Sequence, residues 1–318
     1  MKLLKVLIGA VVGATFGCAA HAQSVSLGTS AQGSATYNIA SAIAKVAGEK
    51  AGLNVVVQPQ GSTGKVLPLV NSGQLHFGLA NILETSNAIK GLEPSEGKPN
   101  PNLKVVAVMY PFATGYFVRK DHPAKTIKDL KGLKISSEYS AHKIIGILAT
   151  SHLANAGLEW SDVQGVPTAN IIGNANDFTE GKTEAGFFAL TAGKVQQMNA
   201  AVGGLRFLSV DDSPEAMERA RKFVPPAFVV EYKPRKGLVG IEEPTKLMVY
   251  DYLIYAGAHV SDETVYKVTK MMAENKSDLA AAFGGFNGLD PKAMHKNNGL
   301  DYHPGAIKFY TEAGLLAQ

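Results

Sequence analysis

Two distant stretches of this sequence repeat one pattern. Residues 47–58, AGEKAGLNVVVQ, and residues 153–164, LANAGLEWSDVQ, both end a helical pattern at Ala-Gly-Leu and continue into an extended segment. Further along, SGQLHFGLAN (72–81) parallels EGKTEAGFFA (180–189), where a glycine closes a helix before a short apolar run. Glycines that end helices are common, so coincidence is the alternative. The repetition favours two α/β lobes built on one plan.

Each lobe reads β-α-β-α-β. The first lobe is expected to have strands over 25–28, 54–58 and 76–80 and helices over 34–50 and 65–72. The second is expected to have strands over 133–137 and 185–190, a helix over 142–156 and a short helix near 175–180. Continuous apolar runs are typical of parallel strands that are buried on both faces.

Two longer extended segments, 103–120 and 245–257, fit neither lobe and are predicted to cross between them. The helical patterns over 263–283 and 304–316 then return to the first lobe. The predicted division is therefore 23–112 plus 250–318 for the first lobe and 113–249 for the second. Two crossing strands would form a hinge.

The N-terminus predicts export. A basic start, an apolar run over 6–20 and the Ala20-His21-Ala22 pattern are typical of a cleaved signal peptide, residues 1–22, with the cut after Ala22. Lipidation at Cys18 is the alternative, although Thr15 stands where such sites usually carry leucine. With the cut after Ala22 the mature chain has no cysteine, and the expected location is the periplasm.

Composition excludes some partners. Removing Lys2 and Lys5 with the signal peptide leaves 29 basic residues (31 − 2) against 27 acidic ones. This balance gives no electrostatic basis for binding nucleic acid or anionic membrane. The stretch QPQGSTGKVLPLV (58–70) looks like a phosphate-binding loop, but it has Pro59 at the first glycine position and Val66 where Ser or Thr would hold Mg²⁺.

Ligands of open α/β sheets bind at the carboxyl ends of the strands, where the N-termini of helices point outward. Four loops occupy such positions: 28–34, 61–64, 136–142 and 167–176. Pro68 has no N–H and fits the first helical turn, so the helix after the second loop is expected to begin near Gly64. Neutral donors around helix N-termini suit a small anion. Ordinary capping of each helix is the alternative for any single loop.

The side chains predicted to contact a ligand come mostly from these loops. Asn81, Tyr37 and Lys65 could instead be an exposed asparagine, a core tyrosine and a solvated lysine, and either Phe187 or Phe188 could wall the pocket. The predicted ligand-binding set is Thr29, Ser30, Gly33, Ser34, Tyr37, Ser62, Thr63, Lys65, Asn81, Ser136, Ser137, His142, Asn170 and Phe188.

Catalytic motifs are missing from the sequence. It contains no G-x-S-x-G elbow and no H-E-x-x-H, and its eight histidines are scattered. His303, before Pro304, is expected to cap a helix or to lie in the core. We therefore expect no enzyme, no metal site and no cofactor.

Several segments in this order resemble one family. SLGTSAQGSATYNIASAIAKV, then GST and LPLVNSGQLHFGLAN, then HPGAIKFYTEAGL resemble the TAXI family of solute receptors of TRAP (tripartite ATP-independent periplasmic) transporters. The resemblance covers essentially the whole mature chain. It implies a two-lobed, periplasmic-binding-protein-like (type II) α/β fold that closes over a small organic anion. Dicarboxylates and acidic amino acids such as 2-oxoglutarate and glutamate are the ligands associated with this family.

The resemblance also implies partners. The expected ones are the integral membrane subunits of a TRAP transporter, and the receptor is expected to be a monomer. Lys65 and Val66 stand where relatives carry Glu and Asn, and 137–142 lacks their glycine-rich turn, which bears on the ligand more than on the fold. An ABC importer, a sensor system and a secreted hydrolase are the alternatives.

Overall fold

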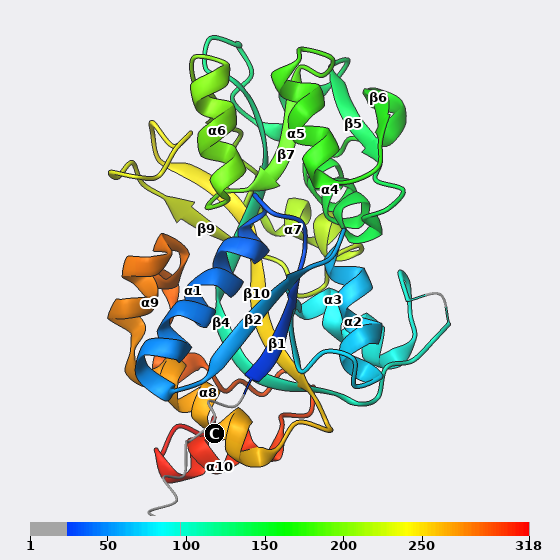
Figure 1. The fold of residues 1–318 in the computed structure, drawn as a ribbon. Coiled ribbons are helices and arrows are strands. Elements are labelled where there is room, and N and C mark those ends of the chain that lie inside the picture. The colour runs from blue at the N-terminus through cyan, green and yellow to red at the C-terminus, as the bar shows by residue number, and fades with distance from the viewer. Residues whose placement is uncertain (1–23, 96, 318) are drawn as a thin grey trace, which may run out of the picture.

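A computed structural model describes residues 24–95 and 97–317 of the chain. The predicted signal peptide, with Cys18 and the cut after Ala22, lies outside the described residues. Figure 1 shows two lobes, one above the other, joined by long strands that run between them.

The first lobe begins with alternating strands and helices. They are β1 (Ser24–Thr29), α1 (Ala35–Ala51), β2 (Asn54–Pro59), α2 (Thr63–Asn71), β3 (Phe77–Asn81) and α3 (Ile82–Lys90). The C-terminal elements pack on this lobe: α8 (Asp262–Glu274), α9 (Lys276–Ala282), η3 (Gly284–Gly288), η4 (Pro291–Ala293) and α10 (Pro304–Glu312).

The second lobe repeats the alternation. It contains η1 (Ile127–Leu130), β5 (Lys134–Glu138), α4 (Lys143–Asn155), η2 (Trp160–Asp162), β6 (Gln164–Thr168), α5 (Ile171–Thr179) and β7 (Ala185–Ala189). It continues through α6 (Gly193–Ala201), β8 (Leu205–Phe207), α7 (Pro214–Arg221) and β9 (Phe228–Tyr232).

The strands form one mixed sheet in the order β2-β1-β3-β10-β4-β7-β5-β6, with β8 on β4 and β9 on β10. Its centre is the antiparallel pair β4 (Leu103–Arg119) and β10 (Thr245–Gly257), in which Tyr110 lies opposite Tyr252. These are the two long segments predicted to cross between lobes. The predicted fold class, a two-lobed α/β fold with two crossing strands, is confirmed. The predicted lobe boundaries at 112/113 and 249/250 fall inside β4 and β10. The division at these points and the hinge in the two strands stay predictions.

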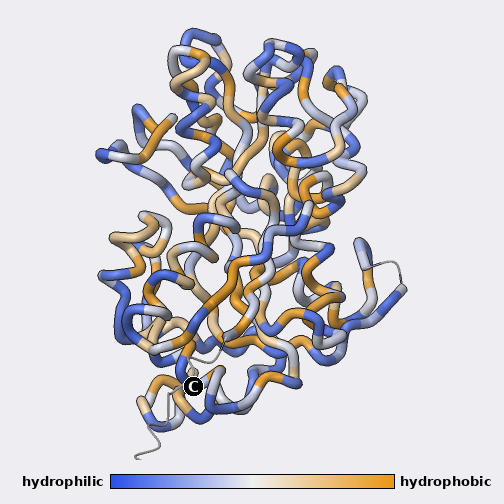
Figure 2. The backbone as a smooth tube through the Cα atoms, viewed as in Figure 1, coloured by the Kyte–Doolittle hydropathy of each residue, from blue (hydrophilic) through white to orange (hydrophobic). Residues whose placement is uncertain are grey.

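The repeated sequence pattern corresponds to repeated geometry. Gly52 and Gly157 follow α1 and α4 with φ of 63° and 71°, a left-handed backbone that glycine adopts without a steric penalty. Each lobe then pairs its strands in parallel: Ser24 of β1 lies opposite Asn54, and Lys134 of β5 lies opposite Gln164. The hydrophobic stretches in Figure 2 follow the interior strands, and hydrophilic stretches gather in peripheral loops.

Three details differ from the sequence-based expectations. Helix α2 begins at Thr63, so Pro68 lies in its second turn and not in the first. A proline there removes one helical hydrogen bond, the one that residue 68 would donate to the Gly64 carbonyl in the first turn. The pattern over 263–283 is two helices that meet at Asn275, and α5 begins four residues before the predicted start. Among the described residues no helix is long and apolar enough to cross a membrane.

Candidate binding site

A cavity lies between the lobes, beside the central strands. It holds about 500 Å³ of empty space, counting the part open to solvent. The first turns of five helices, α1 to α3 from one lobe and α4 and α5 from the other, contribute to its wall. The lining residues are Ser30, Ser34, Ala35, Thr36, Thr63, Asn81, Glu84, Phe112, Thr114, His142, Ile144, Ile145, Leu148, Ile171, Phe187, Phe188, Ala189, Tyr250 and Tyr252.

The first lobe supplies most of the polar groups. Ser34 is the N-cap of α1; its hydroxyl accepts a hydrogen bond from the Tyr37 N–H and lies 2.9 Å from the Ser30 hydroxyl. Thr36, one residue into the first turn, shares a 2.7 Å hydroxyl–hydroxyl bond with Tyr252 of β10. The N–H groups of a first helical turn have no partner inside the helix, so the first turn of α1 favours a negatively charged group.

Glu84 is the one acidic side chain in the lining, and it is only 1% exposed. It lies in the first turn of α3, where its N–H donates to Asn81, the N-cap. The Thr63 hydroxyl donates to its carboxyl, with distances of 2.9 and 2.7 Å to the two oxygens. Burial raises the pKa of Glu84 to about 7, against the smaller lowering by the Thr63 hydrogen bond.

The second lobe supplies a mostly apolar wall. Its polar contribution is His142, the N-cap of α4, which is buried and whose Nδ1 has no hydrogen-bond partner among the described residues. Burial lowers the pKa of His142 to about 4, so the imidazole is neutral at pH 7 and has one N–H to donate. The apolar side chains beside it come from α4, α5 and β7: Ile144, Ile145, Leu148, Ile171, Phe187 and Phe188.

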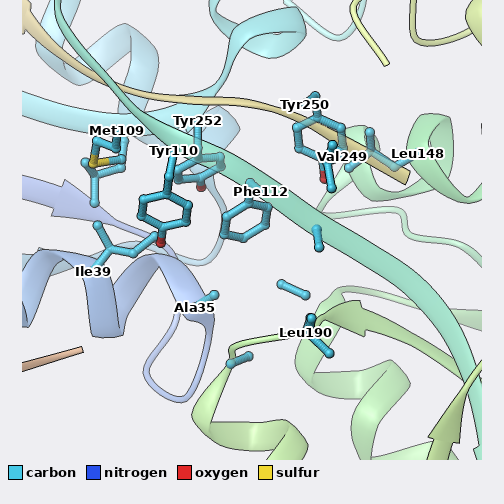
Figure 3. Close-up of a cluster of buried hydrophobic side chains, with 14 of the residues drawn as sticks. Ala35, Ile39, Met109, Tyr110, Phe112, Leu148, Leu190, Val249, Tyr250 and Tyr252 are labelled. Atoms are coloured by element: carbon cyan, nitrogen blue, oxygen red, sulfur yellow. The ribbon is translucent and has the colours of Figure 1, made fainter. Parts of the chain in front are cut away.

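Aromatic rings from the crossing strands form the floor. Phe112 of β4 stacks on Tyr252 of β10 at a ring distance of 4.2 Å and lies 6.1 Å from the ring of Tyr250. Figure 3 shows these three rings beside one another on β4 and β10. Tyr250 and Tyr252 alternate along one strand, which places both on the same face of the sheet.

Six of the fourteen predicted ligand-binding residues line this cavity: Ser30, Ser34, Thr63, Asn81, His142 and Phe188. The other eight lie outside its lining. Thr29 ends β1 and Ser136 lies in the middle of β5; both are buried, and their hydroxyls have no hydrogen-bond partner among the described residues. Ser62 is a buried N-cap. The remaining five are Gly33, Tyr37, Lys65, Ser137 and Asn170.

The structure shows what two of these eight residues do outside the cavity lining. Lys65, the third residue of α2, is exposed and outside the lining, and its Nζ lies over Gly61. Asn170 caps α5, and its side-chain oxygen accepts from the N–H groups of Ile172 and Gly173. Asn170 thus acts as an ordinary helix cap, and Lys65 has the position of a solvated lysine near a helix start, which were the alternatives to a ligand contact.

The lobes also touch at the edge of the cavity. The Lys194 N–H, at the start of α6, donates to the Gly33 carbonyl at 3.2 Å. A Cβ added to neighbouring Gly193 would lie 3.0 Å from Asn38 Nδ2 of α1. A glycine at this position therefore lets the start of α6 approach α1 closely.

The described part of the chain has no group of three metal-binding side chains. The sequence profile of the NMT1-like family matches residues 27–314. The chain belongs to the NMT1-like family. This match spans both lobes and every element that contributes to the cavity.

The fold of this NMT1-like protein is also found in solved structures. A periplasmic transporter protein matches with a TM-score of 0.55 and 16% identity over 92% of this chain and 93% of its own. A protein of Bordetella bronchiseptica RB50 matches with a TM-score of 0.51 and 15% identity, covering 92% and 89%. An ancestral arginine-binding protein bound to arginine matches with a TM-score of 0.50 and 12% identity, covering 83% and 98%. At such identities the likeness shows the fold alone.

Proposed function

We propose that this chain is a periplasmic solute receptor that captures a small organic acid between its lobes and delivers it to a membrane transporter. One observation carries the proposal: the first turns of five helices, from both lobes, open onto one cavity. There the buried His142 Nδ1 has no partner within the described chain. The N–H groups of first helical turns and a neutral imidazole N–H can bind a carboxylate without a positively charged side chain.

Binding between lobes would select the closed form. A ligand shifts a conformational equilibrium only by its different affinity for the two states, and a solute in this cavity contacts both lobes only when they are closed. We propose that the hinge lies in β4 and β10, where the predicted lobe boundaries fall. The family and the fold support binding rather than catalysis.

The resemblance to the TAXI family supports TRAP membrane subunits as the partner, with an ABC importer as the alternative. Dicarboxylates and acidic amino acids are the first solutes to test on the same grounds. Solute uptake into liposomes that contain the membrane subunits encoded beside the gene distinguishes a TRAP transporter from an ABC importer. Uptake driven by an ion gradient without ATP supports the TRAP assignment, and uptake that requires ATP hydrolysis contradicts it.

Solute binding is tested by thermal-shift screening of the mature protein against organic acids and amino acids. We expect at least one to raise the melting temperature, and His142→Ala to weaken its binding by roughly tenfold, the effect of one lost hydrogen bond. His259→Ala is the matched control, because His259 is exposed and outside the lining. A protein that responds to no compound and carries no small molecule in native mass spectrometry would contradict the proposal.

A further inference from the structure

Glu84 lacks the partner that a buried carboxylate needs. The Thr63 hydroxyl has one proton for both oxygens, whereas an ionised carboxylate accepts about four hydrogen bonds. No lysine or arginine is among the residues that line the cavity. In the described chain Glu84 has no ion pair, so a charged carboxylate there would be stabilised most by a cation brought by the ligand.

The aromatic rings that line the cavity with Glu84 also favour a positively charged group. Phe112, Tyr250 and Tyr252 line the cavity with Glu84, and the face of an aromatic ring attracts a cation and repels an anion. Burial is the main cause that raises the pKa of Tyr252, and the charge of Glu84 raises it further. One end of the cavity is therefore suited to an ammonium group.

Other groups of the lining suit a carboxylate. Donors without a negative side chain lie at the first turn of α1, where the bonded pair of Ser30 and Ser34 hydroxyls keeps one proton free. The unpartnered Nδ1 of His142 is a further donor in the tautomer that carries its proton there. The cavity thus offers a place for each charge of a zwitterion.

The second-lobe wall is mostly apolar. The second lobe presents Ile144, Ile145, Leu148, Ile171, Phe187 and Phe188. A second carboxylate placed against these side chains would lose its hydration and gain no partner. An aliphatic or aromatic side chain would gain from burial instead.

We propose that the solute is a monocarboxylic amino acid with an apolar side chain, whose ammonium group is bound by the Glu84 carboxylate. This inference rests on the proposed function and narrows it. It makes Glu84 the residue that distinguishes an amino acid from the corresponding 2-oxo acid, and it makes the second-lobe wall the part that rejects dicarboxylates.

The proposal predicts proton release on binding. Because the pKa of Glu84 lies near 7, the ligand-free protein holds a proton there in about half of the molecules at pH 7, and an ammonium group expels it. The other titratable groups around it are Tyr250, Tyr252, Tyr255 and His142. The tyrosines have raised pKa values and His142 a lowered one, so none of them titrates near pH 7.

Titration calorimetry of the full mature protein tests the proposal with defined probes. These are L-valine, L-leucine and L-phenylalanine, their 2-oxo acids, L-glutamate and 2-oxoglutarate. We expect the affinity for the tightest-binding apolar amino acid to exceed the affinity for its 2-oxo acid by roughly 100-fold. Glu84→Gln is expected to lower the affinity for that amino acid by a similar factor. Glu180→Gln, which removes an exposed carboxylate outside the cavity, is expected to change neither value.

Proton linkage gives the second measurement. Titrations in two buffers of different ionisation enthalpy are expected to show about half a proton released per amino acid at pH 7, and none for Glu84→Gln. Preference for 2-oxoglutarate, or unchanged amino-acid affinity in Glu84→Gln, overturns the inference and leaves the solute receptor in place. Binding of no probe, together with no co-purifying small molecule, overturns both.

Discussion

Replacing Glu84 by glutamine is expected to remove a pH dependence of stability. Glu84 is 1% exposed, and burial raises its pKa from 4.5 to about 7. The unfolded chain therefore gives up this proton at lower pH than the folded protein does. A carboxyl whose pKa is raised by folding contributes its full stability below pH 4.5 and loses it progressively up to about pH 7.

The size of the effect follows from the two pKa values. Each pH unit between them lowers the free energy of unfolding by up to about 1.4 kcal/mol, so the wild-type protein loses about 2–3 kcal/mol between pH 5 and pH 8 from this group alone. Glutamine keeps the shape and a hydrogen-bonding side chain and does not titrate. Between pH 5 and pH 8, the free energy of unfolding of the Glu84→Gln variant is therefore expected to rise by that amount relative to the wild type.

Urea unfolding at pH 5, 6, 7 and 8 provides the measurement, after any bound solute has been removed by unfolding and dialysis. The difference between the two proteins isolates Glu84, because all groups other than its close neighbours titrate alike in both. Two profiles that run parallel within about 0.5 kcal/mol would refute the buried, proton-holding carboxyl on which the ammonium site depends.

Two further substitutions test the packing and the closure. Gly186→Ala would place a Cβ 2.5 Å from the Phe117 ring and is expected to lower the free energy of unfolding by about 1–3 kcal/mol, whereas Gly48→Ala, with no atom closer than 3.8 Å, is expected to be neutral or stabilising in the same urea experiment. Equal effects of the two would contradict the packing at β7. Gly193→Val is expected to hold α6 away from α1 and to weaken solute binding by roughly fivefold in calorimetry, with Asn38→Ala in the same protein restoring it. Affinity unchanged by Gly193→Val would show that this contact does not form in the solute-bound state.

Much of the fold could be predicted from the sequence because local signals were strong. The glycines that end α1 and α4 and the uninterrupted Val, Tyr and Leu runs of β4 and β10 define elements whose type does not depend on distant partners. Helices α3, α6 and α7 and strands β6, β8 and β9 had weaker patterns and were not predicted. Strand β6, with sequence QGVPT, has little apolar character.

The candidate site was predicted only in part. N-cap residues such as Ser34 and Asn81 can be recognised by their position before a helix. Glu84 was not predicted as a site residue because α3 was not predicted. The available signal was Asn81 followed three residues later by Glu84, which is the spacing of a capping box. Tyr250 and Tyr252 alternate within one predicted strand, but which face meets the cavity depends on the pairing of β10 with β4, including its irregularity after Tyr252.

The most direct test of the binding cavity is a crystal structure of the mature protein with the amino acid that binds most tightly. We expect the ligand to lie between α1 and α4, with its nitrogen within hydrogen-bonding distance of the Glu84 carboxyl and its carboxylate at the first turn of α1. A ligand located outside this cavity, or one whose carboxylate rather than its nitrogen meets Glu84, would contradict the proposed binding mode.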